Sequence, residues 1–176
     1  MEHSIAESFQ PAPCLRNGHL QTILASSSFR AWGKNPMFDA AREMILSTSG
    51  GIRLLGFYSS QKCKKSKGLI VLLHGWEGSI ASTYILCTGN ALYGRGYDIF
   101  RLNFRDHGDS HHLNQGIFYA VLLEEVFEAV HQLCRNAKQK PVFLTGFSLG
   151  GNFALRIARK MLQTPIENLC HVAAIS

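Results

Sequence analysis

The chain has 176 residues, of which 46% are hydrophobic, and this composition excludes an intrinsically disordered protein and favours a domain with its own core. Its net charge is +6, yet the cations are scattered except for a lysine run at Lys62, Lys64, Lys65 and Lys67. We interpret that run as a solvated loop and expect no nucleic-acid partner, because no aromatic interleaving or nucleic-acid motif accompanies it.

The cysteines and the apolar runs indicate a cytoplasmic protein. Five cysteines, at positions 14, 63, 87, 134 and 170, lie far apart and form no CxxC pair, which favours reduced thiols. The N-terminal segment lacks the basic start and apolar core of a signal peptide. The longest apolar run, "LIVLL", is too short to span a membrane, so we expect no stable membrane insertion. The oligomeric state is left open.

The N-terminal third predicts an arm followed by a β-hairpin. Residues 1–40 are punctuated by prolines and glycines, which predicts an irregular arm. Residues 42–60 predict two strands around Gly50 and Gly51. The continuous apolar run that follows at residues 68–75 is typical of a strand buried on both faces of a parallel sheet.

Helices and strands alternate through the rest of the sequence. Expected helices cover residues 83–96, 116–135 and 150–162, and expected strands cover residues 97–108, 141–147 and 170–176. Such alternation after a hairpin predicts an α/β domain with a mostly parallel sheet that is covered on both faces. We therefore expect this domain to occupy residues 41–176.

A serine lies between glycines where a predicted strand turns into a predicted helix. Ser148 is the centre of a G-x-S-x-G pattern at residues 146–150. A sharp strand-to-helix turn needs small flanking residues and would project the serine hydroxyl over the positive end of the helix dipole. We predict that Ser148 is a catalytic nucleophile, the alternative being an incidental serine in a glycine-rich turn. The pattern does not match a phosphate-binding loop.

Acyl transfer needs two N–H groups that bind the oxyanion formed on the attacked carbonyl. One is expected from Leu149, which follows the nucleophile, and the other from Trp76, in the loop after the first buried strand. His74 precedes that loop; we expect it to line the pocket, although a purely structural hydrogen-bonding role is open.

The stretch "RDHGDSHH" (105–112) follows the strand expected at 97–108 and is rich in histidine and aspartate. Its spacing fits no standard zinc pattern, and no helix is expected there, so we predict no metal site. Because the stretch lies at the carboxyl end of a central strand, we expect Asp106, His107 and His111 to line the active-site pocket. A catalytic base or acid supplied by His107 or Asp106 stays an alternative.

Four stretches carry a family resemblance: "LRNGHLQTI" (15–23), "HGWEGSIASTY" (74–84), "NFRDHGDSHHLNQGIF" (103–118) and "GFSLGGN" (146–152). The chain resembles the α/β-hydrolase superfamily and, within it, the YheT-like branch of predicted esterases. The resemblance implies the α/β-hydrolase fold and a metal-free, cofactor-free hydrolase of esters or thioesters. It further implies short- to medium-chain acyl esters as substrates and a triad in the order Ser, Asp or Glu, His.

Only Glu167 and His171 follow Ser148 as candidate acid and base, and neither is expected at the carboxyl end of a strand. We expect both to be structural or solvated. The resemblance places two further strands, with the acid and the base, beyond residue 176. On this expectation the chain is the N-terminal part of an α/β-hydrolase domain, truncated after about its sixth strand, and is inactive by itself.

Three functional hypotheses follow. The leading one is a serine hydrolase of carboxylic esters that acts on a small-molecule substrate through a Ser148 acyl-enzyme. The second is a catalytically inactive α/β-hydrolase fragment or binding module. The third is an acyltransferase that uses the same nucleophile and an alcohol acceptor in place of water.

Overall fold

A computed structural model describes residues 10–27, 33–62 and 65–176 of the chain. Lys64 of the lysine run, Cys63 and most of the N-terminal segment considered for a signal peptide lie outside the described residues.

The first forty residues contain short helices, whereas the sequence predicts an irregular arm. They are the 3₁₀-helix η2 (Pro13–Leu15) and the α-helices α1 (Gly18–Ser26) and α2 (Pro36–Asp39). Asparagine side chains begin both α-helices: Asn17 accepts from the N–H groups of His19 and Leu20, and Asn35 accepts from that of Phe38. Such side-chain caps satisfy N–H groups that a helix start would otherwise leave unpaired.

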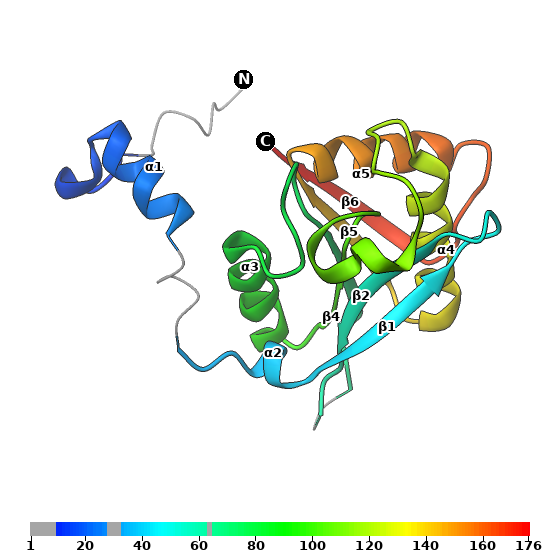
Figure 1. Cartoon of the computed structure of the whole chain (residues 1–176). Coiled ribbons are helices and arrows are strands. Elements are labelled where there is room, and N and C mark those ends of the chain that lie inside the picture. The colour runs from blue at the N-terminus through cyan, green and yellow to red at the C-terminus, as the bar shows by residue number, and fades with distance from the viewer. Residues whose placement is uncertain (1–9, 28–32, 63–64) are drawn as a thin grey trace, which may run out of the picture.

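Six strands form one sheet in the order β1-β2-β4-β3-β5-β6 (Figure 1). The strands are β1 (Ala41–Ser47), β2 (Arg53–Ser59), β3 (Leu69–Leu73), β4 (Asp98–Leu102), β5 (Val142–Phe147) and β6 (Leu169–Ile175). The β1–β2 hairpin is antiparallel, and β2 also pairs antiparallel with β4. Strands β4, β3, β5 and β6 are parallel to one another, which confirms the predicted hairpin and mostly parallel sheet.

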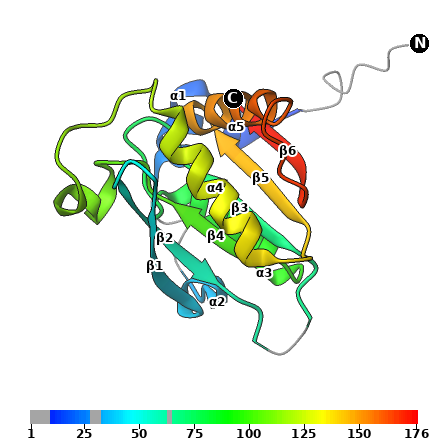
Figure 2. The same ribbon diagram turned by 90° about the vertical axis from the view of Figure 1, so that its right-hand side faces the viewer.

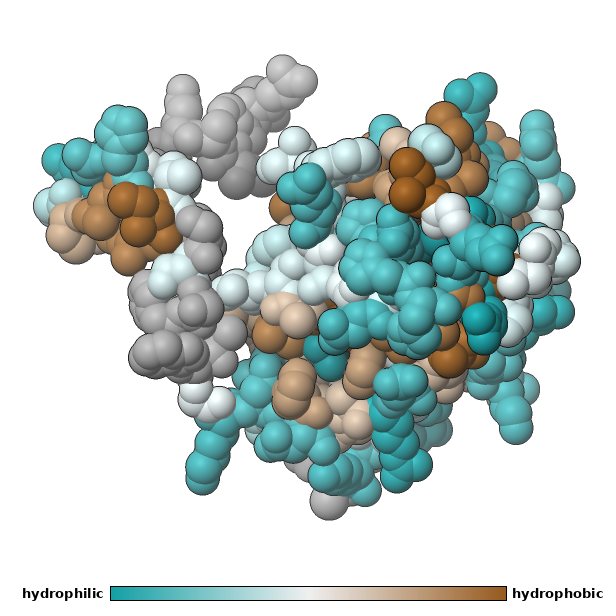
Figure 3. Space-filling model, in the orientation of Figure 1, coloured by the Kyte–Doolittle hydropathy of each residue, from teal (hydrophilic) through white to brown (hydrophobic). Residues whose placement is uncertain are grey.

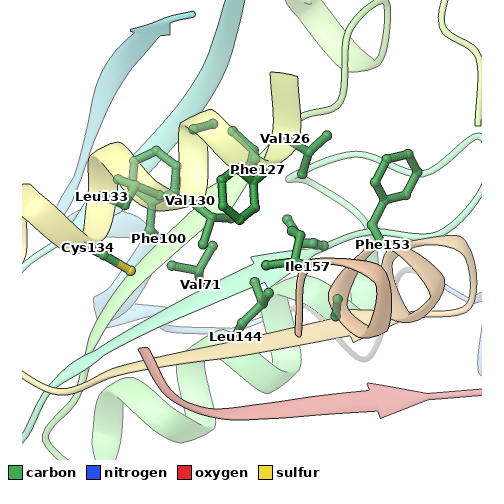
Figure 4. Packing of buried hydrophobic residues seen from close by; sticks show 14 of the residues in the cluster. Val71, Phe100, Val126, Phe127, Val130, Leu133, Cys134, Leu144, Phe153 and Ile157 are labelled. Carbon is green, nitrogen blue, oxygen red and sulfur yellow. The ribbon is translucent and has the colours of Figure 1, made fainter. Parts of the chain in front are cut away.

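Helices cover both faces of the sheet, as the sequence predicts (Figure 2). On one face lie α4 (Leu123–Ala137) and α5 (Leu149–Lys160), whose apolar residues pack on β3, β4 and β5. Figure 4 shows this packing, with Val130 of α4 and Ile157 of α5 beside Val71 of the central strand. On the other face lie α2 and α3 (Thr83–Gly94). Every residue of β3 and β4 is buried, because both strands have helices on each side.

The region between β4 and α4 differs from the prediction. The 3₁₀-helix η4 (Gly108–Leu113) lies in the histidine-rich stretch where no helix is expected. The helix α4 begins at Leu123, seven residues later than its expected start at residue 116. Gly116 has φ of +83°, a conformation incompatible with an α-helix, so the segment from there to Leu122 is a loop.

Candidate active site

Ser148 occupies a strained turn between β5 and α5. Its φ is +50° and its ψ −112°, a combination that costs an L-residue on the order of 1–3 kcal/mol and persists only where surrounding contacts impose it. Two hydrogen bonds do so: the Ser148 N–H donates to the Ile175 carbonyl over 2.7 Å, and its carbonyl accepts from the Asn152 N–H over 3.0 Å. The side chain is exposed at the carboxyl edge of the sheet. The predicted sharp turn is confirmed.

The glycines on either side of Ser148 are required by close backbone packing. A Cβ at Gly146 would lie 2.0 Å from the carbonyl oxygen of Gly150. A Cβ at Gly150 would lie 2.5 Å from the carbonyl oxygen of Leu73, at the end of β3. The G-x-S-x-G pattern therefore reflects how tightly the turn folds on itself and on the neighbouring strand.

The loop after β3 lies against this turn, where the sequence predicts an oxyanion-binding N–H. A Cβ built on Gly75 would be 3.4 Å from Ser148 Cβ. The Gly75 N–H donates to the Tyr84 hydroxyl over 2.8 Å and is therefore occupied. The N–H groups of Trp76 and Leu149 donate to no acceptor within the described ranges. Leu149 is also the first residue of α5, where the helix dipole favours negative charge.

His74 is buried and bridges two loops by hydrogen bonds. Its predicted place in the lining of the active-site pocket stays a prediction. Only 1% of the surface of His74 is exposed. Its Nε2 accepts from the Phe104 N–H over 3.2 Å, so the ring proton lies on Nδ1, which donates to the Gly75 carbonyl over 2.7 Å. Burial lowers the pKa of His74 to about 4, which keeps the imidazole neutral. The ring thereby ties the loop after β3 to the loop after β4.

The loop after β4 arranges its histidines through local contacts. Asp106, at φ of +58°, pairs its carboxylate with Nδ1 of His111 over 2.6 Å. Nδ1 of His107 lies 2.8 Å from the Arg105 carbonyl, and the His107 ring packs edge-on against Phe118 at 5.0 Å. Within the described part of the chain, no three or more His, Cys, Asp or Glu side chains are grouped to hold a metal ion.

The comparisons with known proteins identify the family. Residues 68–176, more than half of the chain, match the sequence model of the alpha/beta hydrolase fold family. The chain belongs to the α/β-hydrolase family. It is 25% identical over 174 residues to a protein of Escherichia coli (strain K12) named "Putative esterase YheT", a match that covers 98% of this chain and 50% of that protein. This match supports the YheT-like branch within the family.

Solved structures show the same fold. The Pyrococcus furiosus esterase Pf2001 has a TM-score of 0.62 and 23% identity, over 80% of this chain and 52% of that one. The Xanthomonas campestris protein XC6422, described as an a/b serine hydrolase without lid, has a TM-score of 0.60 and 19% identity, over 76% of this chain and 60% of that one. The α/β-hydrolase chain thus spans about half the length of its curated relative.

Neither Glu167 nor His171 can act on Ser148 in this α/β-hydrolase chain. His171 pairs with Phe143 in the β5–β6 ladder, five residues before Ser148. At about 3.3 Å per residue, the two lie roughly 16 Å apart along the sheet. Glu167 precedes β6 and is farther still. Among the described residues, no imidazole or carboxylate is hydrogen-bonded to the Ser148 hydroxyl.

A cavity of about 570 Å³ lies beside the loop after β4, and Ser148 is not among its lining residues. From that loop it takes Gly108, Asp109, His112 and Leu113. Asp106, His107 and His111 do not line this cavity, which is separate from Ser148, and their place in the active-site pocket stays a prediction. The remaining lining of the cavity includes Phe38, Phe57 and Arg101, from three segments far apart in the sequence. Sequence analysis missed these residues, although an arginine in the apolar run "YDIFRLNF" was a signal.

Apolar side chains are exposed on the loop after β3 and on the loop before α4. Trp76 is 62% exposed, and its ring lies 6.4 Å from that of Phe118. Tyr119 and Val121, from the loop before α4, are also exposed. Figure 3 shows that apolar residues otherwise form separate patches on a mostly hydrophilic face. None of the described helices has both the length and the apolar character needed to cross a bilayer.

Proposed function

We propose that the chain carries the nucleophile and oxyanion-binding half of a serine esterase active site. The observation that carries this proposal is the strained Ser148 turn, held by backbone contacts at the N-terminus of α5. Strain of this kind is retained where it positions a reacting group. The esterase names of the Escherichia coli and Pyrococcus furiosus relatives agree with it.

In the proposed reaction the Ser148 oxygen forms a bond to the ester carbonyl carbon, and the hydroxyl proton passes to a base. The oxyanion is held by the N–H groups of Trp76 and Leu149, which are free of protein acceptors among the described residues. Collapse expels the alcohol and leaves an acyl-enzyme, which water then hydrolyses to the carboxylic acid and free Ser148. The base is predicted to be a histidine beyond residue 176.

The exposed apolar residues next to Ser148 favour an ester with an apolar acyl group. Trp76 adjoins Gly75, which touches the Ser148 turn, and Phe118 packs beside Trp76. An apolar acyl chain laid along the Trp76 ring, which is 62% exposed, would remove its surface from water. We propose a short- to medium-chain acyl group.

A second candidate concerns the 176-residue chain by itself. Ser148 has no hydrogen-bonded base among the described residues, so its hydroxyl is not activated there. General-base assistance contributes roughly 10²- to 10⁴-fold to such reactions. We therefore propose that this chain alone is an inactive or very slow module with a correctly shaped turn.

Labelling with a fluorophosphonate probe tests both proposals. If the reading frame continues through an Asp and then a His, the longer protein should be labelled, and Ser148→Ala should abolish the signal. Ser47→Ala, which removes an exposed serine on β1, is the matched control and should leave labelling unchanged. Failure of the folded longer protein to label would refute the nucleophile. The 176-residue chain should label at least about 100-fold more slowly, and equal rates would refute the second proposal.

A further inference from the structure

Arg101 is a buried cation without a counter-ion. It lies near the carboxyl end of β4, and only 1% of its surface is exposed. Its guanidinium lies between two aromatic rings, 5.6 Å from the centroids of both Phe38 and Phe57. No carboxylate of the described residues forms an ion pair with it. Burial lowers the pKa of Arg101 to about 10, and the group stays charged at neutral pH.

Most of the hydrogen-bonding capacity of Arg101 is unused. Nη1 donates to the Ile80 carbonyl over 2.8 Å and fixes one end of the guanidinium. Nε is buried and has no partner, and Nη2 makes no hydrogen bond to any described residue. A guanidinium edge formed by Nε and Nη2 matches the two oxygens of a carboxylate.

The cavity of about 570 Å³ that Arg101 lines has the size and composition of a ligand pocket. Apolar side chains make most of its wall, among them Leu55, Phe57 and Leu113. Two acidic residues, Glu43 and Asp109, also line the cavity, and because both are exposed to solvent they form its rim. Such a pocket offers one buried cation, an apolar wall and an acidic entrance.

We propose that this cavity binds a small molecule with one carboxylate and an apolar body. The carboxylate would pair with Arg101, and the apolar body would pack on the aromatic and aliphatic wall. A dianionic phosphate fits less well, because Arg101 is the single arginine or lysine in the lining and because Glu43 and Asp109 repel a dianion more strongly than a monoanion. The site is independent of Ser148, which does not line the cavity.

The test compares an acid with a neutral analogue of the same shape. Binding of 4-phenylbutyrate and of 4-phenyl-1-butanol to the purified, folded chain is measured by calorimetric titration at pH 7. Because a charge-assisted hydrogen bond should be lost with the alcohol, we expect the acid to bind at least about tenfold more tightly. Equal affinities, or no binding of the acid to the folded chain, would overturn the proposal.

Three variants locate the binding. Arg101→Met keeps an apolar side chain between the two rings. It should lower the affinity for the acid at least about tenfold, to that of the alcohol. Ala81→Trp, at an exposed position in the cavity wall, should block both molecules without altering Arg101. Arg42→Met removes an exposed arginine on β1 outside the cavity and should change neither affinity.

If folded Arg101→Met or folded Ala81→Trp binds the acid as tightly as the parent chain does, the proposed site is wrong. If Arg101→Met does not fold, the Ala81→Trp result and the acid-to-alcohol ratio decide. Because these are binding measurements, they stand whether or not Ser148 proves to be a nucleophile.

Discussion

The neutral, buried His74 predicts a specific loss of stability in mild acid. Its ring must stay unprotonated at Nε2 to accept from the Phe104 N–H, and burial lowers its pKa to about 4 from an ordinary value of 6.5. The unfolded chain therefore binds a proton at a higher pH than the folded chain does. The stability that this difference contributes is fully present above pH 6.5 and is lost as the pH falls towards 4.

The size of the effect follows from the two pKa values of His74. With 6.5 in the unfolded chain and about 4 in the folded chain, lowering the pH from 7.5 to 5 should reduce the free energy of unfolding by about 2 kcal/mol. The side chain is almost completely buried, so solvent screening should not diminish this figure much.

Urea unfolding at pH 7.5 and pH 5 measures this difference, and His74→Gln provides the comparison. Other titrating groups contribute equally to both proteins, so the variant should lose about 2 kcal/mol less than the parent between these pH values. Titration of the His74 ring carbons by NMR gives a second measurement that needs no variant. A midpoint near 6.5, or the same pH dependence in both proteins, would refute the buried neutral imidazole.

Three further changes have expected effects on the free energy of unfolding, each measured in urea. Ser148→Gly should raise it by about 1 kcal/mol, because glycine relieves the positive φ, and a decrease would contradict the strain. Gly150→Ala should lower it by about 3 kcal/mol through a backbone clash, whereas Gly50→Ala, with open space, should change it by less than about 0.5 kcal/mol. Arg105→Met should cost about 3 kcal/mol, because it leaves the Glu125 carboxylate buried and unpaired. Adding Glu125→Leu should recover more than half of that loss, and a further loss would contradict this explanation.

Much of the fold could be predicted because its signals are local. The run "LIVLL" is apolar at every position, and all five residues of β3 are buried. The alternation of strands and helices predicts the parallel sheet and its two covering layers. The short helices of the arm and η4 could not be predicted from periodicity, because elements of three to nine residues depend on individual caps and tertiary contacts.

The candidate site also has parts that local sequence predicts and parts that only the folded chain reveals. The Ser148 turn is predictable from its local G-x-S-x-G pattern, in which Gly146 is required by a contact with Gly150 four residues away, although Gly150 is required by contact with the distant Leu73. The cavity is not, because Phe38, Arg101 and His112 come together only when the chain folds. The position of His74 could be predicted but not its burial, since the Phe104 N–H that engages it lies thirty residues away.

Three of the five buried side-chain atoms that lack a hydrogen-bond partner in the described structure lie at or beyond the carboxyl end of β4. At the start of the strand, Asp98 is buried and fully paired: it accepts from the Tyr58 hydroxyl, the Gln61 N–H and the Lys140 ammonium. At and beyond the other end, Arg101 Nε, Asn103 Nδ2 and Arg105 Nε are buried without a hydrogen-bond partner in the described structure. Two other buried atoms without a partner in the described structure lie elsewhere: Ser59 Oγ, on β2 opposite Ile99, and Glu125 Oε1 on α4. Ligands of open α/β sheets bind at the carboxyl ends of strands, and an unpaired buried donor there favours a polar ligand that accepts from it.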